Sequence, residues 1–166
     1  PHIDRIITLG NIMAESIRHD SKKIKLTVIP LPVDTDLLKP LKKNENQFAI
    51  NHQLDGKFVV LYSGKMGRGH NIEIILEAAK FLKGTDDIKF VFIGNGEKVA
   101  LIKEFLRNEN INNVLLLPLQ SDEIFPLSMA VGDIGIVSQE KMIAQLFMPS
   151  KVYSMMSCGE AIIGIG

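Results

Sequence analysis

The 166-residue sequence is poor in the features that would cross-link a small fold or attach it to a charged polymer. A single cysteine, Cys158, excludes a disulfide framework and a cysteine-based zinc site, and it favours a reducing, cytoplasmic environment. Lys and Arg number 19, as do Asp and Glu, which argues against a nucleic-acid partner because general binding needs a basic surplus. No apolar run approaches the length of a membrane span.

From Lys57 onward, short apolar runs alternate with longer stretches of helical periodicity, a pattern typical of a parallel α/β sheet. The nearly continuous apolar runs predict strands that are covered by helices on both faces. They lie at 58–62, 89–93, 114–117, 134–137 and 161–165. Helices are predicted near 71–83 and 97–108, from Ser121 onward, and at 150–157. The expected fold class is therefore α/β, a Rossmann-like parallel sheet with helices on both faces.

The first 40 residues have a different pattern. A strand at 5–9, a helix at 11–19 and a strand at 25–29 predict a separate strand–helix–strand unit, followed by three prolines. The segment 41–56 is polar and predicts a linker, or a loose helix at 47–52. The chain is therefore divided into residues 1–40, a linker at 41–56 and a Rossmann-like domain at 57–166.

The loop from Ser63 to His70 is the richest candidate site, because ligands of doubly wound sheets bind beyond the carboxyl ends of the strands. It reads Ser-Gly-Lys-Met-Gly-Arg-Gly-His and leads into a helix that begins near Asn71. Free backbone N–H groups and the helix dipole favour phosphate there, and the glycines let phosphate oxygens approach the main chain. We predict a phosphate or diphosphate site; the structural alternative is a tight turn with exposed basic residues.

The identity of the phosphate ligand is narrowed by what the loop lacks. Gly64 and Gly69 have P-loop spacing, but His70 and Asn71 stand where a nucleotide triphosphatase needs lysine and a hydroxyl. The strand that follows ends without the acidic residue that holds a ribose in dinucleotide folds, which disfavours NAD.

Two further loops are expected at the same crevice. The turn Gly94-Asn95-Gly96 precedes the second predicted helix, and its main chain is expected to approach a ligand in this crevice. The alternative is a simple turn with no ligand role. Pro149 and Ser150 precede a helix, where Lys151 adds a cation, although proline at a helix start is common for structural reasons.

Several spaced motifs resemble those of the retaining glycosyltransferases of family 4, also called group 1, which have the GT-B fold of two Rossmann-like domains. Residues 28–40 resemble the family's inter-domain segment, and residues 92–96 resemble its "fvGdG" motif. Residues 61–70, LYSGKMGRGH, are similar to the sugar-donor motif in the form seen in polysaccharide-synthesis members. Residues 149–163 resemble the family's "PSKlyeymacGkPVia" segment.

The resemblance implies the C-terminal half of the enzyme, which grips the diphosphate of a nucleotide sugar, a UDP-sugar by expectation. Lys65 falls where the family has its phosphate-binding arginine, and His70 where it has a lysine, so both are expected to stabilise the departing diphosphate. Arg68 is a reserve candidate, and neither a metal nor another cofactor is expected. The expected donor-binding residues are Ser63, Gly64, Lys65, Arg68, His70, Gly94, Asn95, Gly96, Pro149, Ser150, Lys151 and Ser154.

The same resemblance implies what lies outside this chain. Residues 1–40 would be the tail of an N-terminal domain and the inter-domain segment, and residues 57–166 a donor domain that is incomplete at its end. The acceptor site would belong to the missing N-terminal domain, so the isolated piece is expected to be inactive. The acceptor would be a polysaccharide or glycolipid. A lipid-linked acceptor would lie at the inner membrane face, where the cytoplasmic protein would be peripheral.

One departure from the family concerns a Glu-x7-Glu pair that binds donor sugar and ribose in many members. The matching positions hold Leu146 and Ser154, so recognition must differ or fall to backbone groups. Two alternatives stay open: a GT-B-fold UDP-sugar epimerase, which needs acidic and histidine residues facing the crevice, and a non-catalytic nucleotide-binding module.

Overall fold

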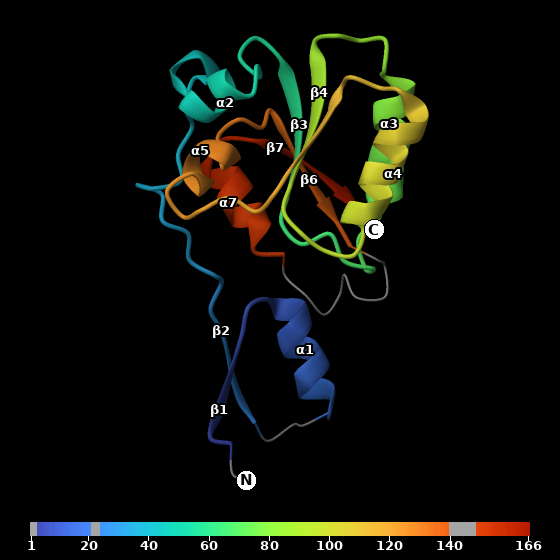
Figure 1. Ribbon diagram of the computed structural model, residues 1–166. Helices are drawn as coiled ribbons and strands as arrows, with labels where there is room; N and C mark the ends of the chain where they lie inside the picture. The colour runs from blue at the N-terminus through green and yellow to red at the C-terminus, as the bar shows by residue number, and fades with distance from the viewer. Residues whose placement is uncertain (1–2, 21–23, 140–148) are drawn as a thin grey trace.

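Figure 1 shows the computed structural model, which describes residues 3–20, 24–139 and 149–166. Two sheets are present in this part of the chain. Strands β1 (Arg5–Thr8) and β2 (Lys25–Val28) pair in parallel and are joined by helix α1 (Asn11–Asp20). An extended stretch then leads to the larger, five-stranded sheet, which lies above the small unit in Figure 1.

The larger sheet is parallel throughout and confirms the predicted fold class. Its strands are β3 (Phe58–Ser63), β4 (Ile88–Ile93), β5 (Val114–Leu117), β6 (Ile134–Ser138) and β7 (Ala161–Ile165). They are ordered β5-β4-β3-β6-β7, and every neighbouring pair is parallel. From β3, the strands β4 and β5 are added in turn toward one edge of the sheet, and β6 and β7 are then added on the other side of β3. The ends of β3 and β6 therefore flank the point where strand order reverses, which is where ligands bind in such sheets.

Helices cover both faces of this sheet (Figure 1). On one face lie α3 (Ile72–Phe81) and α4 (Val99–Glu109). On the other lie α2 (Gln47–Asn51), α5 (Phe125–Met129) and α7 (Lys151–Ser157). The buried stripe of α3, made of Ile72, Ile75, Leu76 and Ala79, has the spacing expected of an amphipathic helix.

The segment 41–56 is part of the larger domain and not a linker, and the alternative prediction of a helix at 47–52 is confirmed. After the short 3-10 turn η1 (Lys43–Glu45), it forms α2, which places Phe48 and Ala49 in the core together with Leu54. Asn46 fixes the start of α2, because its side-chain oxygen accepts the N–H groups of Phe48 and Ala49. Its amide also donates to the carbonyl oxygen of Leu127 at 2.8 Å, which ties the segment to α5.

The third predicted helix begins later than expected. It begins at Phe125 and not at Ser121, since the carbonyl oxygen of Ser121 accepts the N–H groups of Ile124 and Phe125 in a preceding turn. Pro126 occupies the first turn of α5, where its missing N–H is tolerated. The other three predicted helices coincide with α3, α4 and α7 within a few residues at their ends.

Candidate functional site

A cleft of about 520 Å³ opens at the carboxyl end of the sheet, beside the ends of β3 and β6. Its size is in the range of small-molecule sites. It is lined by Ser63, Gly64, Lys65, His70, Leu119, Phe125, Met129, Gln139, Pro149, Ser150, Lys151 and Ser154. The structure thus brings together the predicted residues of the glycine loop (residues 63–70) and of the start of α7, although they lie about 80 positions apart in the sequence.

The glycine loop is anchored on the sheet side by backbone hydrogen bonds. Gly64 donates to the carbonyl oxygen of Ile93 at 2.8 Å, and Met66 donates to that of Asn95 at 2.7 Å. Met66 is fully buried and pins the middle of the loop. These contacts leave Lys65 exposed at the cleft, next to the buried Met66.

Gly94, Asn95 and Gly96 are not on this cleft, so the expectation that they face the same crevice is not met. A methyl group on Gly94 would lie 2.0 Å from the carbonyl oxygen of Gly64, and one on Gly96 would lie 2.4 Å from that of Met66. The glycines are therefore needed because the two loops pack backbone against backbone. The three residues line a neighbouring cavity of about 460 Å³ together with Leu117 and Pro118.

Arg68, the reserve cation, also lies outside the residues that line the cleft. Its side chain is 89% exposed and pairs with Glu97 at 2.6 Å. An ion pair so open to water contributes little to stability. The loop therefore presents Lys65 and His70 to the cleft and turns Arg68 to the surface.

Lys151 is the most unusual group in the cleft. Its ammonium is buried, and no hydrogen-bond partner for it is found in the described parts of the chain. It lies 3.9 Å from the ring centroid of Tyr62, a cation–π contact that compensates part of the lost hydration. Burial lowers the pKa of Lys151 to about 8. A buried ammonium is costly unless it is paired, and an anion in the cleft could supply the missing acceptor.

Tyr62 supports both the loop and the cation, a role that the sequence pattern did not indicate. Burial raises the pKa of Tyr62 well above its usual range, so the hydroxyl stays protonated. It donates to the carbonyl oxygen of Lys65 at 2.8 Å. The ring of His70 meets the same tyrosine edge-on, with the centroids 6.2 Å apart. One aromatic ring thus contacts two of the groups that line the cleft.

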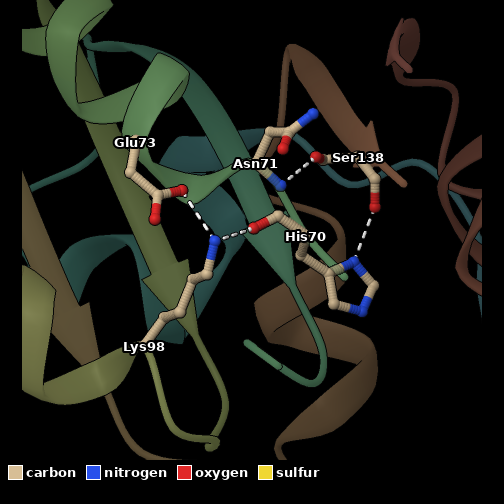
Figure 2. Close-up of polar contacts among 5 residues, drawn as sticks. All are labelled: His70, Asn71, Glu73, Lys98 and Ser138. Carbon is tan, nitrogen blue, oxygen red and sulfur yellow. Dashed lines mark hydrogen bonds and ion pairs between the residues drawn. The ribbon is translucent and has the colours of Figure 1, made fainter. Parts of the chain in front are cut away.

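His70 is oriented by the end of β6, as Figure 2 shows. Its Nδ1 lies 2.6 Å from the carbonyl oxygen of Ser138. A carbonyl oxygen only accepts, so Nδ1 carries the hydrogen and Nε2 is left for a ligand. The hydroxyl of Ser138 accepts the N–H of Asn71 at 2.7 Å. From the other side, Lys98 donates to the carbonyl oxygen of His70 at 2.7 Å and to Glu73 at 2.8 Å.

The electrostatic character of the cleft is one-sided. Its lining includes Lys65, Lys151 and His70, and within the described ranges it includes no Asp or Glu side chain. Ser154 also lines it, whereas Leu146, the other position of the family's glutamate pair, lies outside the described residues. Across residues 3–20, 24–139 and 149–166, no cluster of His, Cys, Asp and Glu has the composition of a metal site. The arrangement suits an anion with several oxygens.

A doubly wound parallel sheet with a cationic cleft at its switch point defines a Rossmann-like domain, a class of fold whose ligands bind at this point of the sheet. Comparison with known proteins then identifies the family. The model of the family described as glycosyl transferases group 1 matches residues 43–144, so the chain belongs to this family, as the motifs predicted.

Individual proteins agree with that assignment. The chain is 30% identical over 114 residues to the putative colanic acid biosynthesis glycosyl transferase WcaI of Escherichia coli K12, covering 67% of this chain and 28% of WcaI. It therefore spans less than a third of that relative. The structure of Anabaena Alr3699/HepE in complex with UDP-glucose matches with a TM-score of 0.75 at 16% identity, over 97% of this chain and 44% of that one.

A second solved structure is a single domain. The C-terminal domain of the group 1 glycosyl transferase LpcC from Francisella tularensis matches with a TM-score of 0.59 at 18% identity, over 80% of this chain and 70% of that domain. At these identities the likeness establishes the fold alone. None of the described helices is long and apolar enough to cross a membrane.

Proposed function

We propose that the cleft binds the diphosphate of a UDP-sugar, and that the chain is the donor-binding part of a retaining glycosyltransferase. The observation that carries this proposal is the buried ammonium of Lys151, which has no hydrogen-bond partner among the described residues and lies beside a cleft whose described lining has no carboxylate. A diphosphate supplies the negative charge and the acceptor oxygens that this ammonium lacks. The similar HepE structure is a complex with UDP-glucose, which supports the choice of a uridine nucleotide.

The proposed chemical role of the cations is to stabilise the leaving group. When the bond between the sugar and the diphosphate breaks, negative charge develops on the departing phosphate oxygen. Lys65, Lys151 and a protonated His70 would stabilise that charge without reorganisation, because the loops already hold them in place. We propose that no metal ion takes part in this step.

Recognition of the sugar would differ from that in family members that carry the glutamate pair. Ser154 lines the cleft at one of the two positions and can offer a hydroxyl, but not a carboxylate. An epimerase is not favoured, because it would need acidic groups facing the crevice and none lines the described part of the cleft.

We further propose that the whole protein transfers the sugar to a polysaccharide or glycolipid acceptor. The name of WcaI refers to colanic acid biosynthesis, which supports polysaccharide assembly. The acceptor site would lie in an N-terminal domain, and a lipid-linked acceptor would bring the cytoplasmic protein to the membrane surface. This chain alone would bind nucleotide but turn over poorly.

The test is calorimetric titration of the chain with UDP, GDP and ADP and with their sugar derivatives. We expect UDP and a UDP-sugar to bind, and Lys65→Ala to weaken binding about tenfold, or about 1.4 kcal/mol. Arg68→Ala is the matched control, since it removes a cation from the same loop but outside the cleft, and it should change affinity less than about twofold.

Two results would contradict the proposal. One is the absence of binding by any nucleoside diphosphate at millimolar concentration; the other is an equal loss of affinity in Arg68→Ala and Lys65→Ala. A non-catalytic nucleotide-binding module predicts instead equal affinity for UDP and for the UDP-sugar, with no donor hydrolysis by a longer chain that includes the N-terminal domain.

A further inference from the structure

The contacts of His70 allow its ring to exchange a proton at one nitrogen only. Nδ1 keeps its hydrogen in both charge states, because it faces the carbonyl oxygen of Ser138 at 2.6 Å (Figure 2). A neutral ring therefore turns the lone pair of Nε2 toward the ligand, and a lone pair cannot bond to a phosphate oxygen. A ring protonated at Nε2 donates a charge-assisted hydrogen bond instead.

We propose that binding of the UDP-sugar is coupled to uptake of a proton from solvent by Nε2 of His70, with Ser138 and Lys98 as the residues that position the ring. This inference rests on the proposed function. The bond that forms is N–H at Nε2, the proton comes from the buffer, and the imidazolium then donates to a diphosphate oxygen. A lysine at this position would be charged before the ligand arrives and would take up no proton.

The charges around His70 favour this coupling. The ring of Tyr62 and the ammonium of Lys98 contact His70, Lys98 also pairs with Glu73, and Lys65 and Lys151 line the same cleft. The carboxylate of Glu73 is engaged by Lys98 at 2.8 Å, and Lys98 contacts the carbonyl oxygen of His70 and not its ring. The described lining therefore supplies no carboxylate that would hold a proton on Nε2 in the empty cleft. The negative charge that stabilises the imidazolium is brought by the ligand.

The experiment is calorimetry with UDP-glucose, or with UDP-N-acetylglucosamine if that binds more tightly, in two buffers of different ionisation enthalpy at pH 7. A UDP-sugar is the right probe because each of its two phosphates is substituted on two oxygens, by one ester and the shared anhydride bridge, and so keeps a fixed charge. The terminal phosphate of UDP instead titrates near neutral pH, with a pKa of about 6. We expect a net uptake of protons on binding that clearly exceeds the contribution of Lys151. Lys151, with a pKa of about 8, is already about nine-tenths charged there and contributes about a tenth.

The control variant is His70→Lys, which keeps a cation but removes the titration. It should bind the UDP-sugar with uptake of about a tenth of a proton, and His70→Gln should bind more weakly with the same small uptake. Binding with equal heats in both buffers, or uptake unchanged in these variants, would overturn the inference while leaving the proposed function intact. Absence of binding to wild-type protein would overturn both.

Discussion

Replacing Lys151 with methionine should stabilise the protein while weakening its affinity for the nucleotide. The ammonium is buried without a hydrogen-bond partner in the described residues, so the folded protein holds a charge that is better solvated when the chain is unfolded. Methionine fills a similar volume, needs no partner and can keep a contact with the ring of Tyr62 through its sulfur. The same substitution removes a cation that we place on the diphosphate.

The magnitude follows from the pKa of Lys151, which burial lowers from 10.5 to about 8. At about 1.36 kcal/mol for each pH unit, the folded state loses about 3 kcal/mol by keeping this group charged. Because the pKa of Lys151 is lower in the folded state, the charged ammonium destabilises the fold fully below pH 8. This destabilisation disappears as the pH rises from about 8 to 10.5. Loss of the cation–π contact offsets about 1 kcal/mol, so a net gain of about 2 kcal/mol is expected at pH 7.

The assay is urea unfolding at pH 7 and at pH 10, followed by circular dichroism and compared with Lys98→Met. Lys98 is the matched control because its ammonium has two partners, His70 and Glu73, so its removal should destabilise the fold. The advantage of Lys151→Met over wild type should shrink at pH 10. If Lys151→Met is destabilised as much as Lys98→Met, the ammonium is not held at a cost and this reasoning is wrong.

Three other substitutions test the fold around the site. Burial, with Asp133 nearby, raises the pKa of Glu160 to about 8. The free energy of unfolding of the wild-type protein should therefore fall as the pH rises from 4.5 to 8. In Glu160→Gln, urea denaturation should show a fall over this range that is smaller by up to several kcal/mol. Gly94→Ala places a methyl group 2.0 Å from the carbonyl oxygen of Gly64 and should lower the melting temperature in calorimetry by about 10 °C or more. Phe48→Ala should cost about 3–5 kcal/mol in urea unfolding, whereas a residue in a true linker would cost almost nothing.

The strands could be predicted because each is a nearly continuous apolar run, and the observed strands lie within a residue of the predicted ones. The place of the segment 41–56 in the larger domain could not, because its buried apolar residues, Phe48, Ala49 and Leu54, stand within a largely polar stretch. What makes that segment part of the domain is the contact of Asn46 with Leu127, more than 80 residues away.

The site was predictable to the extent that it follows from topology. Lys65, His70 and Lys151 meet because the ends of parallel strands share one edge of the sheet. The contact of Lys151 with Tyr62 depends on side-chain packing, and the glycines at 94 and 96 depend on how closely two loops approach. Neither leaves a periodic signal in the sequence, so the sequence did not indicate the tyrosine, nor that the second glycine turn lines a neighbouring cavity.

The most direct test of the central claim is a crystal structure of this chain with a bound UDP-sugar. The account predicts that the diphosphate lies in the cleft between the glycine loop and the start of α7, within hydrogen-bond distance of the ammonium of Lys151 and of Nε2 of His70. A nucleotide bound elsewhere, with Lys151 still unpartnered over Tyr62, would contradict it.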